Sequence, residues 1–342
     1  MKRLIFCVLC LLLTSQALAA SKELYIYNWS EYMPDSVLED FTKETGIKVI
    51  MSTYDSNEAL YAKIRMVEAK GYDLIVPSTD FVARMRKEGL LRPLDKSKLT
   101  NLGNLDPQLL NQAFDPDNIF SVPYMWGSTA IAVNTTNPAA AAVTSYADLW
   151  KPELKSKILL PNDMRGVLGM GLKRLGYSLN ETDPAKVAEA CELLMPLMES
   201  VRVFDSDSPK QALLNNEVQA AVLWNGEAYI ASDENPDIRY VYPTEGFSLW
   251  IDNLCIPKNA ANVDNAHLFI DYLLRPEVAA FICQEMGYSS PNLAAQALLP
   301  EDVRGNAIVY PAPEDMARGE FETDLGPAVK AYEECWMRLK TQ

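Results

Sequence analysis

The chain has a single histidine and far fewer basic than acidic side chains. It carries 31 lysines and arginines against 46 aspartates and glutamates, a formal net charge of -15. A nucleic-acid-binding protein needs a basic surface, so we expect no nucleic-acid partner. His267 is the one histidine, which argues against histidine-based metal sites and a histidine general base. We therefore predict no metal ion and no cofactor.

The sequence motifs of several enzyme classes are also absent. The chain contains no G-x-x-x-x-G-K-[ST] phosphate loop, no G-x-G-x-x-G turn, no G-x-S-x-G elbow and no H-E-x-x-H helix. Acidic residues are numerous, but their spacing singles out no catalytic pair. We expect a protein that is not an enzyme; an exported hydrolase of amine-containing substrates is a distant alternative.

Long hydrophobic runs are missing outside the N-terminus. Met1-Lys2-Arg3 is a short basic start, Leu4 to Leu13 is apolar, and Ala17-Leu18-Ala19 has the form of a cleavage site. These three regions predict a secretory signal peptide over residues 1–20. The apolar run is too short for a membrane-spanning helix. The mature chain is therefore expected to be exported and soluble.

Cysteine is scarce beyond this leader. Four cysteines remain, at Cys191, Cys255, Cys283 and Cys335, and an exported protein can join them in disulfides. Cys255 lies in an apolar strand-like run and Cys283 in a helical one, where cysteine often packs as a small hydrophobic residue. Four cysteines allow three complete pairings, which the sequence leaves open.

Apolar runs of strand length alternate with segments of helical periodicity along the mature chain. The alternation predicts an α/β fold with largely parallel sheets, and the length suggests about two domains. Strands are predicted at 24–29, 47–54, 72–76, 129–134, 220–224 and 245–257. Helices are predicted at 34–45, 57–69, 81–88, 185–197 and 264–286.

Tryptophans stand beside acids at the ends of predicted strands. Trp29-Ser30-Glu31-Tyr32 follows the first strand, Trp224 ends another, and Trp250 precedes Asp252 by two residues. Ligands of open α/β sheets bind beyond the carboxyl ends of strands. An indole face attracts a cation, and a nearby carboxylate adds to that attraction. This pattern predicts a ligand with ammonium groups joined by methylenes.

Twelve short segments, which follow one another in the same order as in one protein family, give a resemblance over essentially the whole mature chain. The segments are YNWSEY (27–32), ETGIKVI (44–50), YDSNEALYAK (54–63), YDLIVPST (72–79), MRKEG (85–89), LDKSKLTN (94–101), NLDPQLLN (104–111), FDPDN (114–118), SVPYMWG (121–127), DLWKPE (148–153), LLRPEVA (273–279) and GYSSPN (287–292). Together they resemble the periplasmic spermidine/putrescine-binding proteins that feed ABC importers.

The resemblance implies a type II periplasmic binding protein fold of two lobes. Each lobe is expected to be a mostly parallel sheet flanked by helices, with a hinge that the chain crosses twice. Lobe 1 would comprise residues 21–127 and 251–296, and lobe 2 residues 128–250 and 297–342. The ligand would be clamped between the lobes.

The family's ligand-binding pattern also carries over to individual residues. Aromatic side chains would sandwich the methylenes of the polyamine, while acids would take its nitrogens. The matching residues are Trp29, Ser30, Glu31, Tyr32, Ser78, Asp163, Ser206, Trp224, Trp250, Asp252 and Tyr288.

Three positions depart from the pattern of the spermidine binders. Gly166 replaces an acid, Asp80 replaces an aromatic residue, and Glu322 replaces a glutamine. We add Asp80 and Glu322 to the predicted binding site; the alternative is that both point to solvent. Since buried charges must match the amine spacing of the ligand, spermidine, norspermidine and putrescine all remain candidates.

The resemblance implies a monomeric, periplasmic polyamine-binding protein. In the main interpretation it presents a spermidine-like cation to the inner-membrane permease of an ABC importer. In the alternative it is a polyamine sensor that docks on a membrane signalling receptor.

Overall fold

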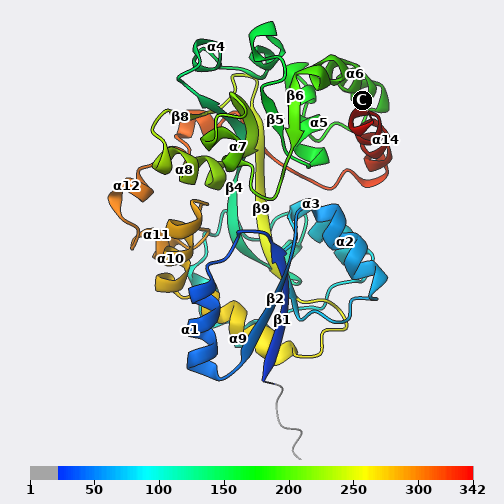
Figure 1. The fold of residues 1–342 in the computed structure, drawn as a ribbon. Helices are drawn as coiled ribbons and strands as arrows, with labels where there is room; N and C mark the ends of the chain where they lie inside the picture. Colours follow the sequence, from blue (N-terminus) through cyan, green and yellow to red (C-terminus); the bar gives the residue numbers. More distant parts are fainter. Residues whose placement is uncertain (1–21, 342) are drawn as a thin grey trace, which may run out of the picture.

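The computed structural model describes residues 22–341, so the predicted signal peptide lies outside the described residues. Figure 1 shows two lobes, one above the other, joined by two long strands. The lower lobe contains the N-terminal βα units and the upper lobe most of the middle and the end of the chain. The fold is thus α/β and two-lobed; the residue ranges given above for the lobes remain a prediction.

The lower lobe is built on a strand–helix alternation close to the predicted one. Its parallel strands β1, β2 and β3 bury Leu24 and Ile26 against a core that includes Phe41, whose ring meets that of Phe269 edge-on at 4.8 Å. The elements are β1 (Glu23–Trp29), α1 (Asp35–Thr45), β2 (Lys48–Tyr54), α2 (Asn57–Met66), β3 (Leu74–Ile75) and α3 (Thr79–Lys87).

The upper lobe repeats the α/β arrangement. Strand β5 pairs in parallel with both β6 and β7, and helices cover the sheet. Its elements are α4 (Pro138–Ala141), β5 (Ile158–Leu160), α5 (Met164–Arg174), α6 (Pro184–Leu194), β6 (Val201–Phe204), α7 (Lys210–Leu214), β7 (Ala220–Trp224), α8 (Asn225–Glu234), β8 (Ile238–Val241) and α14 (Val329–Lys340).

Two long antiparallel strands, β4 (Ser121–Asn134) and β9 (Phe247–Cys255), run side by side from one lobe into the other. The predicted strand at 129–134 therefore begins eight residues earlier, at Ser121. Proline lacks an N–H for the ladder, and the register shifts between Pro123 and Met125, so a bulge accommodates the proline. The resulting mixed sheet has the order β2-β1-β3-β9-β4-β7-β5-β6, with β8 beside β4 and β10 (Gly319–Phe321) beside β9.

The prediction of one continuous helix at 264–286 was wrong. Two helices occupy this stretch, α9 (Val263–Leu273) and α10 (Pro276–Met286). Proline disfavours a helical conformation in the residue before it, and Arg275 is extended, so the first helix ends there and Pro276 opens the next. The chain continues through α11 (Leu293–Gln296), α12 (Glu301–Arg304), α13 (Pro313–Met316) and β10 (Gly319–Phe321).

Short 3₁₀ helices complete the fold. The predicted helix at 185–197 ends as α6 at Leu194 and passes directly into one of them. They span Lys96–Lys98, Leu102–Asn104, Pro116–Asn118, Tyr146–Trp150, Pro152–Leu154, Met195–Ser200 and Gly326–Ala328.

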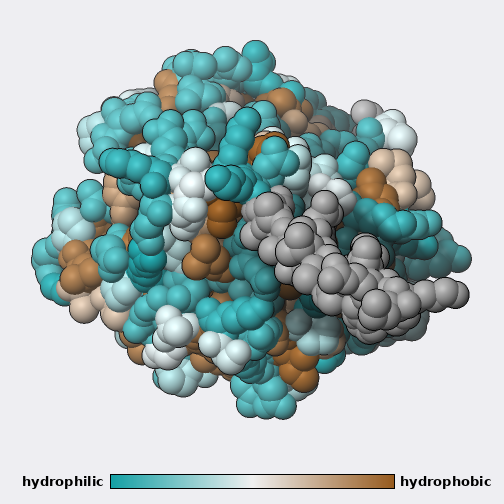
Figure 2. Space-filling view, turned by 90° about the horizontal axis from the view of Figure 1, so that it is seen from below, coloured by the Kyte–Doolittle hydropathy of each residue, from teal (hydrophilic) through white to brown (hydrophobic). Residues whose placement is uncertain are grey.

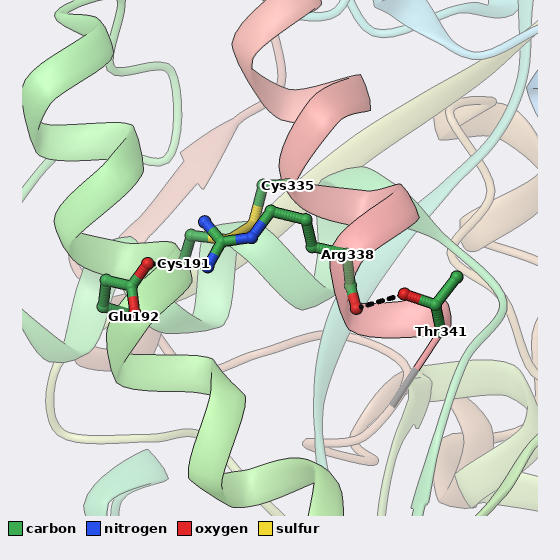
Figure 3. The surroundings of a disulfide bond; sticks show 5 residues. All are labelled: Cys191, Glu192, Cys335, Arg338 and Thr341. Carbon is green, nitrogen blue, oxygen red and sulfur yellow. Dashed lines mark hydrogen bonds and ion pairs between the residues drawn. A yellow bond between two sulfur atoms is a disulfide. The ribbon is translucent and has the colours of Figure 1, made fainter.

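One disulfide joins Cys191 of α6 to Cys335 of α14 (Figure 3). Beside it, Arg338 donates a hydrogen bond to Glu192 at 2.7 Å between the same two helices. Cys255 and Cys283 are free thiols, both buried. Of the pairings that the sequence left open, the structure contains the Cys191–Cys335 disulfide, which links the C-terminal helix α14 to α6 of the upper lobe.

The surface at the lower end of the molecule is mainly polar. Figure 2 shows the lower end of the molecule, where hydrophilic side chains dominate and hydrophobic ones are scattered among them. The large exposed hydrophobic residues include Met66 on α2. Among residues 22–341, no helix combines the length and the apolar character needed to cross a membrane.

Candidate functional site

A cavity lies between the two lobes, where strand ends of the lower lobe face those of the upper lobe. It encloses about 710 Å³, the space at its open mouth included. Five carboxylates and one guanidinium line it, together with tryptophan and tyrosine rings. The lining residues are Trp29, Ser30, Tyr32, Asp55, Ser56, Asn57, Glu58, Ser78, Phe81, Asp163, Arg165, Ser206, Trp224, Trp250, Asp252, Tyr288 and Glu322.

Asp252 is fixed at the centre of this cavity by two hydroxyl groups. It lies on β9, is 4% exposed, and accepts hydrogen bonds from Tyr32 at 2.7 Å and from Ser78 at 2.5 Å. Ser78 precedes α3, but its hydroxyl does not cap that helix. Burial raises the pKa of Asp252 to about 7, although both hydrogen bonds lower it. A carboxylate has about four acceptor positions, so it retains capacity for a ligand donor.

Aromatic rings form the walls on either side of Asp252. Trp250 and Tyr288 meet edge-on with ring centroids 5.5 Å apart, while Trp29 and Trp224 face each other across the lobes at 6.3 Å. The indole of Trp250 packs on β4 at Gly127, where an added Cβ would come within 2.6 Å of the ring. Only glycine leaves this space free. The walls thus present aromatic surface to whatever occupies the cavity.

A second group of acids, Glu58, Asp163 and Glu322, lines the same cavity. Glu322 is 7% exposed and accepts a hydrogen bond from Ser248 at 2.6 Å. Burial, with repulsion from Asp163 and from Asp80, raises the pKa of Glu322 to about 8. Burial also raises the pKa of Glu58 and of Asp163 to about 7. These carboxylates lack enough positive charge around them and would bind a cation favourably.

Arg165 is the only cationic side chain among the lining residues. It follows the N-cap residue of α5, Asp163, whose carboxylate accepts a hydrogen bond from the Arg165 amide at 2.9 Å. Its guanidinium donates to Asn180 at 2.6 Å, to the carbonyl of Thr323 at 2.9 Å and to Asp80 at 3.3 Å. One guanidinium therefore faces several carboxylates, and the region stays net acidic.

The structure brings together every predicted site residue except Glu31 and Asp80. Ser206 lies at the edge of the cavity, where its hydroxyl accepts a hydrogen bond from the amide of Asn162 at 2.8 Å. At Gly166, an added Cβ would come within 2.7 Å of the Asp163 carboxylate. The glycine that stands where the family has an acid therefore leaves room for the Asp163 side chain.

Glu31 and Asp80 do not line the cavity, and each pairs with a basic side chain. Glu31 is exposed and pairs across the lobes with Lys210 at 2.5 Å, and Lys210 also contacts the buried Glu227 at 3.1 Å. Asp80 is 8% exposed, which contradicts the alternative that it points to solvent. Its carboxylate lies 3.3 Å from the Arg165 guanidinium, and this attraction offsets part of the cost of burying both charges.

The sequence analysis missed part of the lining. The missed residues are Asp55, Ser56, Asn57, Glu58, Phe81 and Arg165. Residues 55–58 directly follow strand β2, as residues 30–32 follow β1, so the rule that located Trp29 could have located them. No local pattern marks Arg165, because its role comes from long-range partners. Within residues 22–341, no group of three or more histidine, cysteine or acidic side chains is arranged to hold a metal ion.

Comparison with known proteins decides the family. The profile of the bacterial extracellular solute-binding proteins matches residues 36–309. The chain belongs to this family. A spermidine/putrescine-binding periplasmic protein of Salmonella typhimurium is 49% identical over 317 residues, which cover 93% of this chain and 91% of that protein. This confirms the resemblance and the predicted periplasmic location of the solute-binding protein.

Two solved structures of solute-binding proteins share the fold. One, a Listeria monocytogenes protein provisionally assigned to a spermidine/putrescine ABC transporter, is 40% identical with a TM-score of 0.89, covering 94% of this chain and 99% of that one. The other is a spermidine/putrescine ABC transporter substrate-binding protein of Streptococcus pneumoniae. It is 41% identical with a TM-score of 0.78, and the match covers 94% of this chain and 99% of that one. Both confirm the two-lobed α/β architecture.

Proposed function

We propose that the chain binds a linear polyamine of the spermidine type between its lobes and delivers it to an ABC importer, without catalysing a reaction. The observation that carries the proposal is the buried Asp252, held between aromatic walls and facing a second acidic group. Three relatives bearing spermidine/putrescine names, described above, support the ligand class and the importer.

The chemistry of the cavity matches a thin aliphatic chain with charged nitrogens. Tryptophan faces attract ammonium groups by about 0.5–2 kcal/mol and also cover apolar methylenes. Asp252 accepts a nitrogen at the centre, while Asp163 and Glu322 accept nitrogens at the far end. A neutral sugar would leave these carboxylates without counter-charges, at a cost of several kcal/mol each for a buried ion.

Closure of the lobes links binding to transport. Trp29 ends β1 of the lower lobe, whereas Trp224 ends β7 and Asp163 precedes α5 of the upper lobe. A ligand that contacts both sets stabilises the closed form over an open one, since its affinity for the two forms differs. A permease that recognises the closed form then receives only the loaded protein.

Calorimetric titration tests the proposal directly. The mature protein is titrated with putrescine, cadaverine, spermidine, norspermidine and spermine at two salt concentrations. We expect at least one of them to bind with a Kd of about 1 μM or tighter, near -8 kcal/mol. If none binds, or if a sugar or amino acid binds more tightly, the proposal fails.

A further inference from the structure

A second cavity adjoins the first on the far side of Arg165. It encloses about 1020 Å³, its open mouth included, and its lining includes carboxylates of α3, of α14 and of the segment before α14. Glu58, Phe81 and Arg165 line both cavities, whereas Asp80 lines the second alone. These three shared side chains form a partition, which we call the end wall.

The guanidinium of Arg165 is held in the end wall from both lobes. Within the upper lobe it is anchored by Asn180 and by the carbonyl of Thr323. It then reaches from α5 to Asp80 on α3 of the lower lobe (Figure 1). Arg165 is 5% exposed and Asp80 is 8% exposed, so solvent screens the pair little. Moving the guanidinium aside would leave a buried carboxylate without its partner, which costs several kcal/mol.

We propose that Arg165, locked by Asp80, limits the length of the ligand and so selects triamines and shorter amines over tetraamines. The inference rests on the proposed polyamine function and adds a residue that determines specificity. A ligand nitrogen beside Asp163 and Glu322 meets carboxylates. The next ammonium further along would meet the positive guanidinium, which repels it.

The space behind the end wall is suited to an extra ammonium once the guanidinium is gone. Besides Arg165, its lining carries five carboxylates and two cations, and the cations pair with acids of the same lining. The carboxylates are Glu58, Asp80, Glu88, Asp324 and Glu333; Arg84 pairs with Glu88 and Lys87 with Asp324. Truncation of Arg165 would therefore open the partition and at the same time release Asp80 as a partner for a fourth nitrogen. The limit on length thus depends on one side chain.

The test compares the Kd ratio of spermine to spermidine in Arg165→Ala and in the unmodified protein. In the unmodified protein we expect spermine to bind at least about tenfold more weakly, and Arg165→Ala to reduce this gap by about tenfold. The matched control is Lys87→Ala. Lys87 also pairs across the lobes, with Asp324, and lines the second cavity but not the first. The control should leave the ratio unchanged within about twofold.

Each result separates this inference from the proposed function. Three results would contradict the role of Arg165 in limiting ligand length but not polyamine binding itself. They are an unchanged Kd ratio in Arg165→Ala, an equal shift of the ratio in Lys87→Ala, and equal binding of both amines by the unmodified protein. Failure of every amine to bind the unmodified protein would overturn both. If Arg165→Ala does not fold because carboxylates are left unpaired, Asp80→Asn combined with Arg165→Ala removes both charges. This double variant must still show a smaller gap than the unmodified protein, because the guanidinium no longer repels the fourth ammonium.

Discussion

Tyr32 donates a hydrogen bond of 2.7 Å to Asp252, a residue 220 positions further along the chain. Ser78 donates to the other oxygen of the same carboxylate at 2.5 Å. Three separate segments thus fix one buried acid at the point where the aromatic walls meet. The contact shows how the fold prepares a negative charge before any cation arrives, so that little reorganisation is left for binding.

Replacement of Asp252 should weaken polyamine binding clearly. Asp252→Asn removes a buried negative charge while keeping the shape of the side chain, and Trp250→Ala removes an aromatic wall. We expect each change to raise the Kd for the preferred polyamine more than about tenfold. The control is Asp264→Asn, an exposed acid that pairs with Lys98 on the surface. Calorimetry showing unchanged affinity in both site variants would mean that the site lies elsewhere.

Binding should strengthen as the pH rises from about 6 to 8, because four carboxylates that line the cavity, Glu58 among them, have raised pKa values. Without a ligand the pKa values of Asp163 and Asp252 are about 7 and that of Glu322 is about 8, so near neutral pH each is partly protonated. Ammonium groups, which titrate near pH 10, stabilise the charged carboxylates and expel these protons.

Calorimetry in buffers of different ionisation enthalpy at pH 7 measures this proton release. We expect a net release of protons on binding, and we expect the affinity to decrease when the pH is lowered below 6. Proton uptake, or an affinity independent of pH between 6 and 8, would show that the buried acids do not contact the ligand.

Glu322 should distinguish ligands by their number of nitrogens. Glu322→Gln keeps an acceptor for Ser248 but removes the charge. We expect this change to weaken the binding of a triamine by about 1–3 kcal/mol and the binding of a diamine by less. A diamine is too short to contact both Asp252 and Glu322, whereas a triamine contacts both. Glu31→Gln, at the exposed edge, should change both affinities only slightly. Equal losses for diamine and triamine would contradict this role of Glu322.

The disulfide should stabilise the fold without affecting the ligand. It closes a loop between residues 144 positions apart, and loops of this size gain about 2–5 kcal/mol from a bridge. Cys191→Ser combined with Cys335→Ser should lower the free energy of unfolding in urea by that order and leave the Kd unchanged. A reducing agent should destabilise the unmodified protein but not the double variant. Equal unfolding midpoints of the two proteins would argue against the bridge.

The strand and helix pattern of the lower lobe could be predicted because each element has local signals. The 34–45 helix, for example, is closed by Gly46 in a left-handed conformation, a common helix end. The sequence also predicted that Trp29, Trp224 and Asp252 would meet, because strand ends gather at one edge of a sheet. The break before Pro276 was missed because apolar periodicity continues on both sides of it.

Long-range pairing accounts for what the sequence could not predict. Asp80 and Arg165 are 85 residues apart, and only the folded structure shows that they pair. The same holds for Lys210 and Glu31. In both cases an acid expected to contact the ligand has a basic partner within the protein. Charge patterns along a chain identify acids but not their partners.

The most direct test of the central claim is a crystal structure of the mature protein with spermidine. We predict ligand nitrogens about 3 Å from the carboxylates of Asp252 and of Glu322 or Asp163, with the methylenes between Trp250 and its neighbouring rings. Spermidine found elsewhere, or in the cavity with its nitrogens turned away from these acids, would contradict the claim.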